Sequence, residues 1–234
     1  MRSTHNPGRF AGVLYLLMAI PAPFALIYLP RTLIVQGNAT ATANNITSSE
    51  TLFRLGIVAE LISQILFIFV VLALYDLLKE VNRRQARLMV VFVLVSVPIA
   101  FLNEMNSIAA LLLVRGVDFL SVIGKPQQDA LAMFFLKLHG GGLAVVQIFW
   151  GLWLFPLGLL VYRSGFLPRI LGILLIVNSF AYPILSLTYF LAPQYGALAS
   201  RVMTLPEFGE LWFILWLLIK GAIPKPSVVR SSPQ

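Results

Sequence analysis

The stretch from Leu131 to Val177 decides the fold: LAMFFLKLHGGGLAVVQIFWGLWLFPLGLLVYRSGFLPRILGILLIV. It consists of two apolar runs joined by a short basic hinge, Tyr162 to Arg169. About 20 apolar residues allow a helix to cross the roughly 30 Å hydrocarbon core of a bilayer, and each run is long enough. The hinge carries two arginines and no acidic residue, which is typical of a short cytoplasmic loop. The stretch therefore predicts a transmembrane hairpin whose turn faces the cytoplasm.

The composition of the 234-residue chain extends this prediction to the whole protein. With 59% hydrophobic and 11% charged residues, the chain is too apolar for a soluble domain. The apolar residues come in long blocks, without the alternation expected of an outer-membrane barrel. We therefore predict an all-α fold, a polytopic transmembrane helical bundle. Cysteine is absent, which excludes disulfides, thiolate nucleophiles and cysteine metal ligands.

The apolar blocks predict six transmembrane helices. The first block can also be read as a signal peptide, but its apolar residues continue beyond Pro21 and Pro23. This length favours an uncleaved helix that is kinked at these prolines. The six predicted spans are Phe10–Val35, Leu52–Leu78, Leu88–Val114, Leu131–Val161, Ile170–Leu191 and Glu207–Ile223.

The segments between the blocks are predicted to be loops. The segment 36–49 is polar, uncharged and free of apolar periodicity, and the segment 115–129 contains a Gly-Lys-Pro turn signal. A further loop, 192–206, is expected to connect the last two spans. Residues 224–234 are rich in Pro and Ser, so we expect a disordered cytoplasmic tail. Residues 1–223 then form a single transmembrane domain.

The basic residues predict the orientation of the bundle. The loop from Lys79 to Arg87 carries four basic residues and one acid, which is a strong cytoplasmic signal. An N-in, C-in arrangement places eleven of the 17 Lys and Arg residues on the inside. A net charge of +8 would indicate nucleic-acid binding in a soluble protein. Here the basic residues flank apolar blocks, so we expect membrane lipids and no nucleic acid as partners.

Several polar side chains fall inside the predicted spans, where ionisable groups are costly and mark a functional site by default. Counting along each span places them in the outer half of the membrane. We expect a polar pocket that opens toward the outer leaflet between spans two, three, four and six. Lys137 is expected to pair with a carboxylate or with an anionic headgroup. The residues of this ligand or proton pocket are Glu60, Gln64, Asn103, Glu104, Lys137, His139 and Glu210.

These residues also have a purely structural explanation. Lys137 and a carboxylate can form an ion pair that only satisfies buried charge, and His139 can be a hydrogen-bonded core residue. The small residues from Gly140 to Gly158 indicate a close helix contact. The chain lacks H-E-x-x-H, G-x-S-x-G, P-loop and G-x-G-x-x-G motifs. We therefore predict no catalytic residue, no metal ion and no cofactor.

The pocket leaves three functions open, of which we favour the first. It can bind or transport a lipid-like or small amphiphilic ligand, with Glu60 and Glu104 supplying charge or a proton. Alternatively, the protein is an intramembrane lipid-modifying enzyme in which His139 and a carboxylate act as acid and base. In the third case, it is a structural or accessory subunit. The sequence determines neither the ligand nor the oligomeric state.

Three stretches of the chain resemble a bacterial multi-pass membrane family catalogued as a domain of unknown function (DUF4386-like). The residues that carry the resemblance are Phe149–Val177, Arg9–Leu16 and Leu74–Asn82, so it covers nearly the whole chain. The resemblance implies a multi-pass protein of the bacterial cytoplasmic membrane. It implies no activity and no catalytic residues, so the candidate site rests on the membrane argument alone.

Overall fold

The computed structural model describes residues 6–223, apart from the side chains of Phe119, Leu205 and Glu207. Within these residues the fold is all-α, and six helices are long and apolar enough to cross a membrane. This finding confirms the predicted transmembrane bundle. The expected tail, 224–234, lies outside the described residues. The six spans are Pro7–Leu33, α5 (Glu50–Leu78), α6 (Arg83–Arg115), α7 (Lys125–Arg163), α8 (Arg169–Leu191) and Pro193–Ile219, which contains η3 (Pro193–Tyr195) and α9 (Gly196–Ile219).

The first span is a helix that changes type halfway along. It begins as α1 (Pro7–Ala19) and continues through α2 (Pro21–Pro23) into a π-helical turn, η1 (Phe24–Tyr28), and α3 (Leu29–Leu33). Prolines 21 and 23 remove two backbone donors, and such interruptions of the regular hydrogen-bond ladder accompany π-helical turns. The structure shows a local change of helix type at and after these prolines, and the kink stays a prediction.

The prediction of a loop at 36–49 was wrong, because the segment contains the helix α4 (Ala39–Ser48). The side chain of Asn38 caps this helix by accepting a hydrogen bond from the backbone N–H of Ala41 at 2.9 Å. Ala43 and Ile46 are fully buried in a cluster with residues of α3, α5, α6 and α7. Thr and Asn are poor helix formers, so the polar sequence conceals a helix that tertiary packing stabilises.

The predicted start of the sixth span was also wrong. The helix α9 begins at Gly196, and Pro206 lies inside it. The expected loop at 192–206 therefore shrinks to the short 3₁₀ turn η3 and its flanking residue Ala192. Proline is tolerated within membrane helices, because neighbouring groups can satisfy the backbone that it frees. Between α6 and α7, in contrast, the predicted loop is present, and its one regular element in the described chain is the 3₁₀ turn η2 (Asp118–Leu120).

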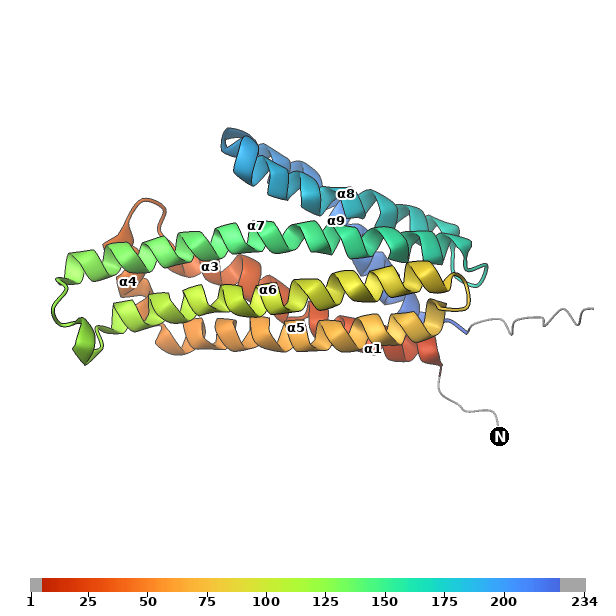
Figure 1. The fold of residues 1–234 in the computed structure, drawn as a ribbon, viewed down its shortest axis with the longest axis horizontal. Helices are drawn as coiled ribbons and strands as arrows, with labels where there is room; N and C mark the ends of the chain where they lie inside the picture. Colours follow the sequence, from red (N-terminus) through yellow and green to blue (C-terminus); the bar gives the residue numbers. More distant parts are fainter. Residues whose placement is uncertain (1–5, 224–234) are drawn as a thin grey trace, which may run out of the picture.

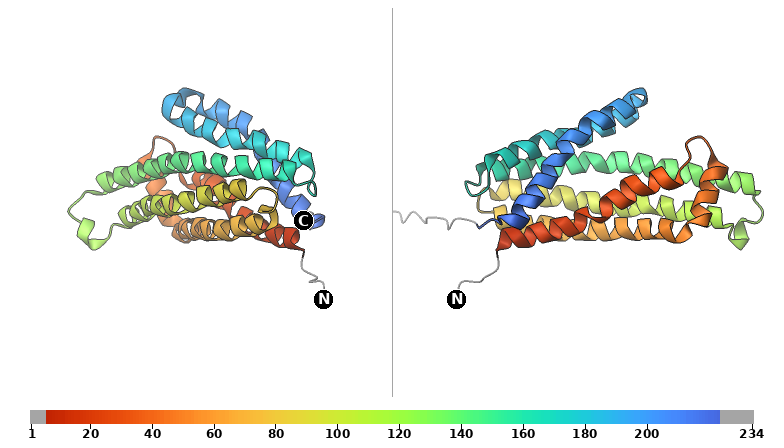
Figure 2. Two further views of the ribbon diagram at one scale, coloured as in Figure 1. Left: turned by 45° about the vertical axis from the view of Figure 1, so that its right-hand side comes forward. Right: turned by 180° about the vertical axis from the view of Figure 1, so that it is seen from behind.

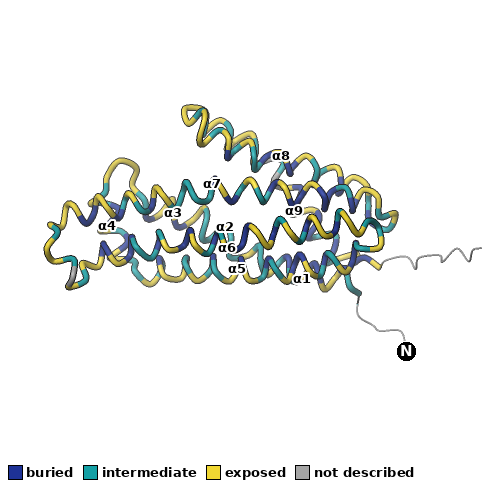
Figure 3. The backbone as a smooth tube through the Cα atoms, in the orientation of Figure 1, coloured by how far each residue is buried: buried dark blue, intermediate teal, exposed yellow. Residues whose placement is uncertain are grey.

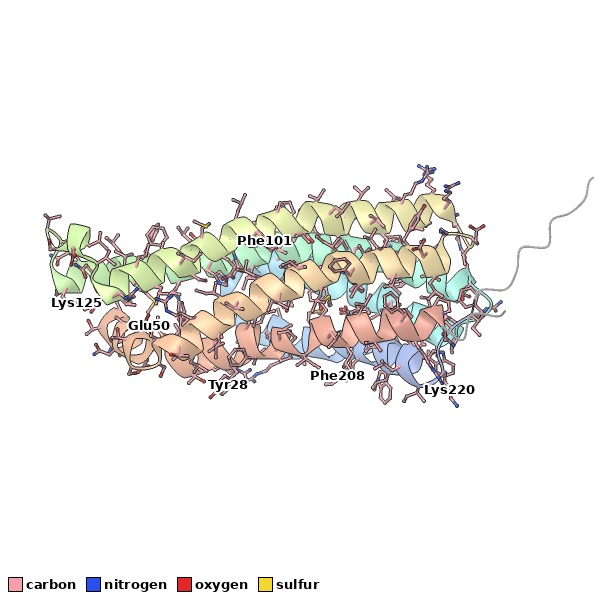
Figure 4. All side chains as sticks on the ribbon, turned by 90° about the horizontal axis from the view of Figure 1, so that it is seen from below. Tyr28, Glu50, Phe101, Lys125, Phe208 and Lys220 are labelled. Carbon is pink, nitrogen blue, oxygen red and sulfur yellow. The ribbon has the colours of Figure 1, made fainter. Side chains whose placement is uncertain are left out.

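The two ends of the described chain lie together at one end of the bundle (Figure 1). The backbone N–H of Gly8 donates to the carbonyl of Ala222 at 3.0 Å, and the side chain of Asn6 accepts from the N–H of Ala222 at 3.0 Å. We call this end the terminal end and the other end the α4 end. Figure 4 shows Lys220 at the terminal end, with Glu50 and Lys125 at the α4 end.

Two apolar cores occupy the two ends of the bundle. The terminal-end core joins α1, α5, α6, α7, α8 and α9, and its largest fully buried side chains include Tyr15, Trp153 and Phe213. The smaller α4-end core joins α3, α4, α5, α6 and α7, but it contains no described residue of α8 or α9. Figure 3 shows the buried positions along the inner faces of the long helices.

The helices α8 and α9 diverge from the bundle toward the α4 end (Figure 2). Near the terminal end α7 and α8 touch closely, since a Cβ added to Gly158 would lie 2.9 Å from the carbonyl oxygen of Gly172. A Cβ added to Gly140 would meet nothing within 4 Å. There the separation leaves a groove of about 670 Å³ between α7, α8, η3 and α9. The predicted small-residue contact is thus present at Gly158 and absent at Gly140.

Candidate functional site

A layer of buried polar side chains lies between the two apolar cores. Residues of the α5 face Gly56, Glu60, Ser63 and Gln64 recur every three or four positions, which brings them to one side of the helix. A second set on α6, Asn103, Glu104 and Ser107, repeats the same spacing. His139 of α7 completes the group through its contact with Glu104. We call the following residues the polar layer: Glu60, Ser63, Gln64, Asn103, Glu104, Ser107 and His139.

Glu104 and His139 form a direct contact inside this layer. The Nε2 atom of His139 lies 2.7 Å from Oε1 of Glu104, and the carboxylate side chain is only 5% exposed. Asn103 strengthens the same junction, because its Nδ2 donates to the backbone carbonyl of His139 at 3.0 Å. Gly142 makes room for this side chain, since a Cβ at that position would collide with the Asn103 amide. The pair of α6 and α7 is therefore held by polar contacts at this depth.

Glu60 and Gln64 are members of the layer whose hydrogen bonding is incomplete. Oε1 of Glu60 accepts a hydrogen bond from Nε2 of Gln64 at 2.9 Å, within α5. The other carboxylate oxygen, Oε2, is buried and has no partner among the described residues, and the same holds for Oε1 of Gln64. Both unsatisfied atoms are hydrogen-bond acceptors. Buried polar atoms are normally paired, so these side chains call for a partner that the described chain does not provide.

Glu210 belongs to a separate cluster nearer the terminal end. Its Oε1 accepts from Nδ2 of Asn178 at 2.8 Å and from the hydroxyl of Tyr182 at 2.9 Å, while its Oε2 accepts from the hydroxyl of Tyr15. Glu210 lies about nine residues from the end of α9, or roughly 14 Å along the helix, whereas Glu60 lies roughly 27 Å from the end of α5. Glu210 is therefore closer to the terminal end of its helix than Glu60 is.

A cavity of about 130 Å³ connects the polar layer with the Glu210 cluster. Helices of the first, second, fourth, fifth and sixth spans contribute to its wall. The polar groups that face it are Glu60, Ser63, Gln64, Tyr182 and Glu210. The rest of the wall is apolar or aromatic, and consists of Met18, Ala22, Leu26, Phe67, Trp150 and Trp153.

A second, smaller cavity of about 60 Å³ lies on the other side of Glu60, toward the α4 end. It shares Leu26 and Glu60 with the first cavity, and Glu104 and His139 also line it. Leu26 belongs to the π-helical turn η1, so the irregular part of the first span forms a wall of both cavities. π-Helical turns are frequent at functional sites, because they change the direction of side chains locally.

Lys137 lies outside the site, which corrects the expected pairing. Its side chain is exposed and its Nζ donates to Oε1 of Gln36 at 3.0 Å. Residues two positions apart on an α-helix differ by about 200° around the helix axis, so Lys137 and His139 point in nearly opposite directions. The predicted ion pair of Lys137 with Glu60 or Glu104 is not formed. The structure thus unites Glu60, Gln64, Asn103, Glu104 and His139, places Glu210 at the far wall of the larger cavity, and separates Lys137.

The site has the groups for proton exchange and for binding a polar ligand. Among the described residues, no group of three or more His, Cys, Asp or Glu side chains is placed to hold a metal ion. His139 and Glu104 can share a proton, and Glu60 can accept one or bind a donor. The apolar wall of the cavities suits the hydrocarbon part of a ligand.

The sequence analysis placed no residue of the first or fifth span in the pocket. Tyr15 of α1 and Asn178 of α8 are fully buried partners of Glu210, and Leu26 lines both cavities. Asn178 and Tyr182 are one helical turn apart, which is a visible polar face on α8. In contrast, Tyr15 and Leu26 stand in apolar surroundings, and no pattern in the sequence distinguishes them from lipid-facing residues.

Comparisons with known proteins assign the chain to a family. The family model "Domain of unknown function (DUF4386)" matches residues 10–221, so the chain belongs to this family. A protein of Archaeoglobus fulgidus named "Uncharacterized protein" is 41% identical over 86 residues, which are 37% of this chain and 49% of that protein. The matched part is thus about half the length of this relative. No solved structure matches the chain. Together with the six apolar spans, the family makes this a multi-pass membrane protein.

Proposed function

We propose that this member of the DUF4386 family binds or transports a lipid-like or small amphiphilic ligand in the two cavities around Glu60. The observation that carries the proposal is that Glu60 lines both cavities and that its buried Oε2 atom has no partner among the described residues. A ligand with a polar head and an apolar body would satisfy this atom and fill the apolar walls. Membrane lipids and such a ligand are then the partners of the protein.

The energetic cost of the site supports a binding role. A charged side chain in a membrane helix costs about 3 kcal/mol even on the mildest scales, and it marks a functional pathway by default. A purely structural carboxylate would have its hydrogen bonds satisfied within the protein, as Glu210 has. Glu60 lacks this satisfaction, so its charge or proton is available to a ligand.

Native mass spectrometry of the full chain in a mild detergent tests this proposal. The wild-type protein is expected to retain a bound molecule, and Glu60→Gln is expected to lose it, because glutamine preserves the bond to Gln64 but removes the charge. Glu80→Gln is the matched control, since Glu80 is exposed in the loop after α5. A wild-type protein that is bare, or ligand retention in Glu60→Gln, would contradict the proposal and favour a structural role.

One observation favours the alternative of an intramembrane lipid-modifying enzyme. The 2.7 Å contact between His139 and Glu104 at the wall of the smaller cavity resembles the arrangement of a general acid–base pair. In this case His139→Gln would retain the bound molecule and abolish its chemical conversion. If incubation of the wild-type protein with a membrane lipid extract leaves the composition of the lipids unchanged, the binding or transport role stands.

The proposed location is the bacterial cytoplasmic membrane with both termini inside. Short cytoplasmic loops are rich in Lys and Arg. The described basic residues near the terminal end are Arg9, Lys79, Arg83, Arg84, Arg87, Arg163, Arg169 and Lys220.

The absence of native cysteine allows a direct test of this orientation. Thr40→Cys, at the α4 end, is expected to react with a membrane-impermeant maleimide in intact cells. Glu80→Cys, at the terminal end, is expected to react only after the membrane is permeabilised. Both positions are exposed in the structure. The opposite labelling pattern would reverse the orientation.

A further inference from the structure

The larger cavity is lined by aromatic rings from three helices. Phe67 of α5, Trp150 and Trp153 of α7 and Tyr182 of α8 all face it. Two pairs of these rings meet edge to face, with centroids 5.0 Å apart for Phe67 and Trp153 and 5.8 Å apart for Trp150 and Tyr182. The π faces of such rings carry a negative potential that attracts organic cations. The sequence analysis assigned no binding role to these residues.

The wall of the larger cavity contains two acidic side chains and, among the described residues, no basic one. Glu60 and Glu210 both face the cavity, while none of the described residues that line it is Lys, Arg or His. The hydrogen bonds to both side chains come from neutral groups, and burying an ionised carboxylate without a counter-charge is costly. The nearest possible cation of the layer, His139, is in contact with Glu104 on the other side of Glu60. A positively charged ligand in the cavity would provide the counter-charge for these carboxylates.

The unsatisfied atoms specify a hydrogen-bond donor. Both buried atoms without a partner beside this cavity, Oε2 of Glu60 and Oε1 of Gln64, are acceptors. The orientation of the Gln64 amide follows from its neighbour, because its NH₂ group donates to Glu60. A bare metal ion fits the site poorly, since most of the wall is hydrocarbon or aromatic and no metal-binding group of three side chains is present among the described residues.

We propose that the cavity between Glu60 and the Trp150–Trp153 face binds the protonated amine of an alkylammonium amphiphile. The inference rests on the proposed function, and it assigns the ligand a positive charge. The ammonium N–H donates to Oε2 of Glu60, and the adjacent methylene groups lie against the aromatic rings. The cavity of about 130 Å³ approaches the ~150 Å³ that accommodates a benzene molecule, so it takes an amine with a few carbons. The smaller cavity, which shares Glu60 and Leu26, extends the space for the alkyl chain.

Isothermal titration calorimetry of the full chain in an alkyl maltoside micelle tests the proposal, because this detergent carries no ammonium group. The probes are hexylammonium, hexyl sulfate and 1-hexanol, which share one chain and differ in charge. Hexylammonium is expected to bind most tightly. Glu60→Gln is expected to weaken its binding by about 30-fold or more, since a buried charge partner is lost. Trp150→Leu is expected to weaken it by about threefold to 30-fold, through loss of the cation–π contact.

The controls separate the ligand class from the proposed function itself. Glu80→Gln is expected to bind hexylammonium like the wild type, and an unchanged melting temperature of Glu60→Gln and Trp150→Leu shows that these variants are folded. If 1-hexanol or hexyl sulfate binds as tightly as hexylammonium, the assignment of a positive charge to the ligand is wrong, while the proposal of ligand binding is retained. If no probe binds and native mass spectrometry finds the wild-type protein bare, the proposed function fails as well. Hexylammonium binding that survives in Glu60→Gln also overturns the assignment.

Discussion

The two halves of α7 stand in different surroundings: one half is packed closely against α8, and the other half borders a groove. At the terminal end Gly158 brings α7 against the backbone of α8, and the surrounding core joins all six spans. At the other half Gly140 faces open space at a groove of about 670 Å³, because α8 and α9 have diverged. Close packing replaces the hydrophobic effect as the main attraction between helices in lipid. The terminal end therefore holds α7 and α8 together, and toward the α4 end these two helices separate.

The two buried carboxylates repeat this contrast at the level of single side chains. Glu210 accepts hydrogen bonds from three residues on two neighbouring spans, whereas Glu60 is bonded only to Gln64 of its own helix. A carboxylate with donors from other helices stabilises their arrangement. A buried carboxylate without donors from other helices destabilises the folded state, so it is retained for a reason other than stability. The following four predictions test both contrasts, from the largest effect to the smallest.

Replacing Gly158 is expected to have the largest effect on folding. In Gly158→Leu the new Cβ would lie 2.7 Å from Cγ1 of Ile176 and 2.9 Å from the carbonyl oxygen of Gly172, so α8 must move away. We expect a loss of more than about 4 kcal/mol, with little folded protein in detergent. Gly140→Leu is the matched change at the open half, and its melting temperature should stay near that of the wild type. Equal losses in both variants would remove the distinction between the halves.

Truncation of a side chain in the terminal-end core is expected to have the next largest effect. Leu74 is 0% exposed, while Leu72 on the same helix is 43% exposed on the outer surface. Leu74→Ala leaves a cavity and should reduce the free energy of unfolding by about 3 kcal/mol. Leu72→Ala should change it by less than about 0.5 kcal/mol. Equilibrium unfolding in mixed micelles measures both values, and similar values would show that the core is not where stability resides.

Glu210→Gln is expected to have an intermediate effect. The amide replaces one of the two acceptor oxygens by an NH₂ group, which cannot accept. Depending on the orientation of the amide, either the bond from Tyr15 or the bonds from Asn178 and Tyr182 are lost. A buried donor left without its acceptor costs about 1–3 kcal/mol. The same unfolding measurement, with Glu80→Gln as a control for the charge alone, tests this loss. An unchanged stability would mean that the cluster does not hold α1, α8 and α9 together.

Glu60→Gln is expected to have the smallest effect on stability and to weaken ligand binding strongly. Glutamine preserves the bond to Gln64 and removes a charge that has no partner for its Oε2 atom. The free energy of unfolding without ligand should stay unchanged or rise by up to about 1 kcal/mol. A loss as large as that of Glu210→Gln would identify Glu60 as a structural residue and would blur the contrast between the two carboxylates.

Most of the fold was predictable from local patterns, because each span must satisfy its own backbone in lipid and therefore shows a long apolar block. The six spans and the polar faces of α5 and α6 follow from such patterns. Where a segment leaves the hydrocarbon region, this constraint ends. The polar helix α4 was missed for this reason, and the first turns of α9 were missed because Pro206 lies inside that helix.

By itself, the sequence determined that this is a six-span helical membrane protein and that Glu60, Gln64, Asn103, Glu104 and His139 fall inside its spans. These are properties of single segments, and hydropathy and helical spacing express them directly. Only the tertiary structure decided which of these side chains meet, that Lys137 lies outside, and that Tyr15 and Tyr182 bond to Glu210. Such contacts depend on how helices are rotated and tilted against each other. That geometry comes from close packing at residues such as Gly158, which no single span encodes alone.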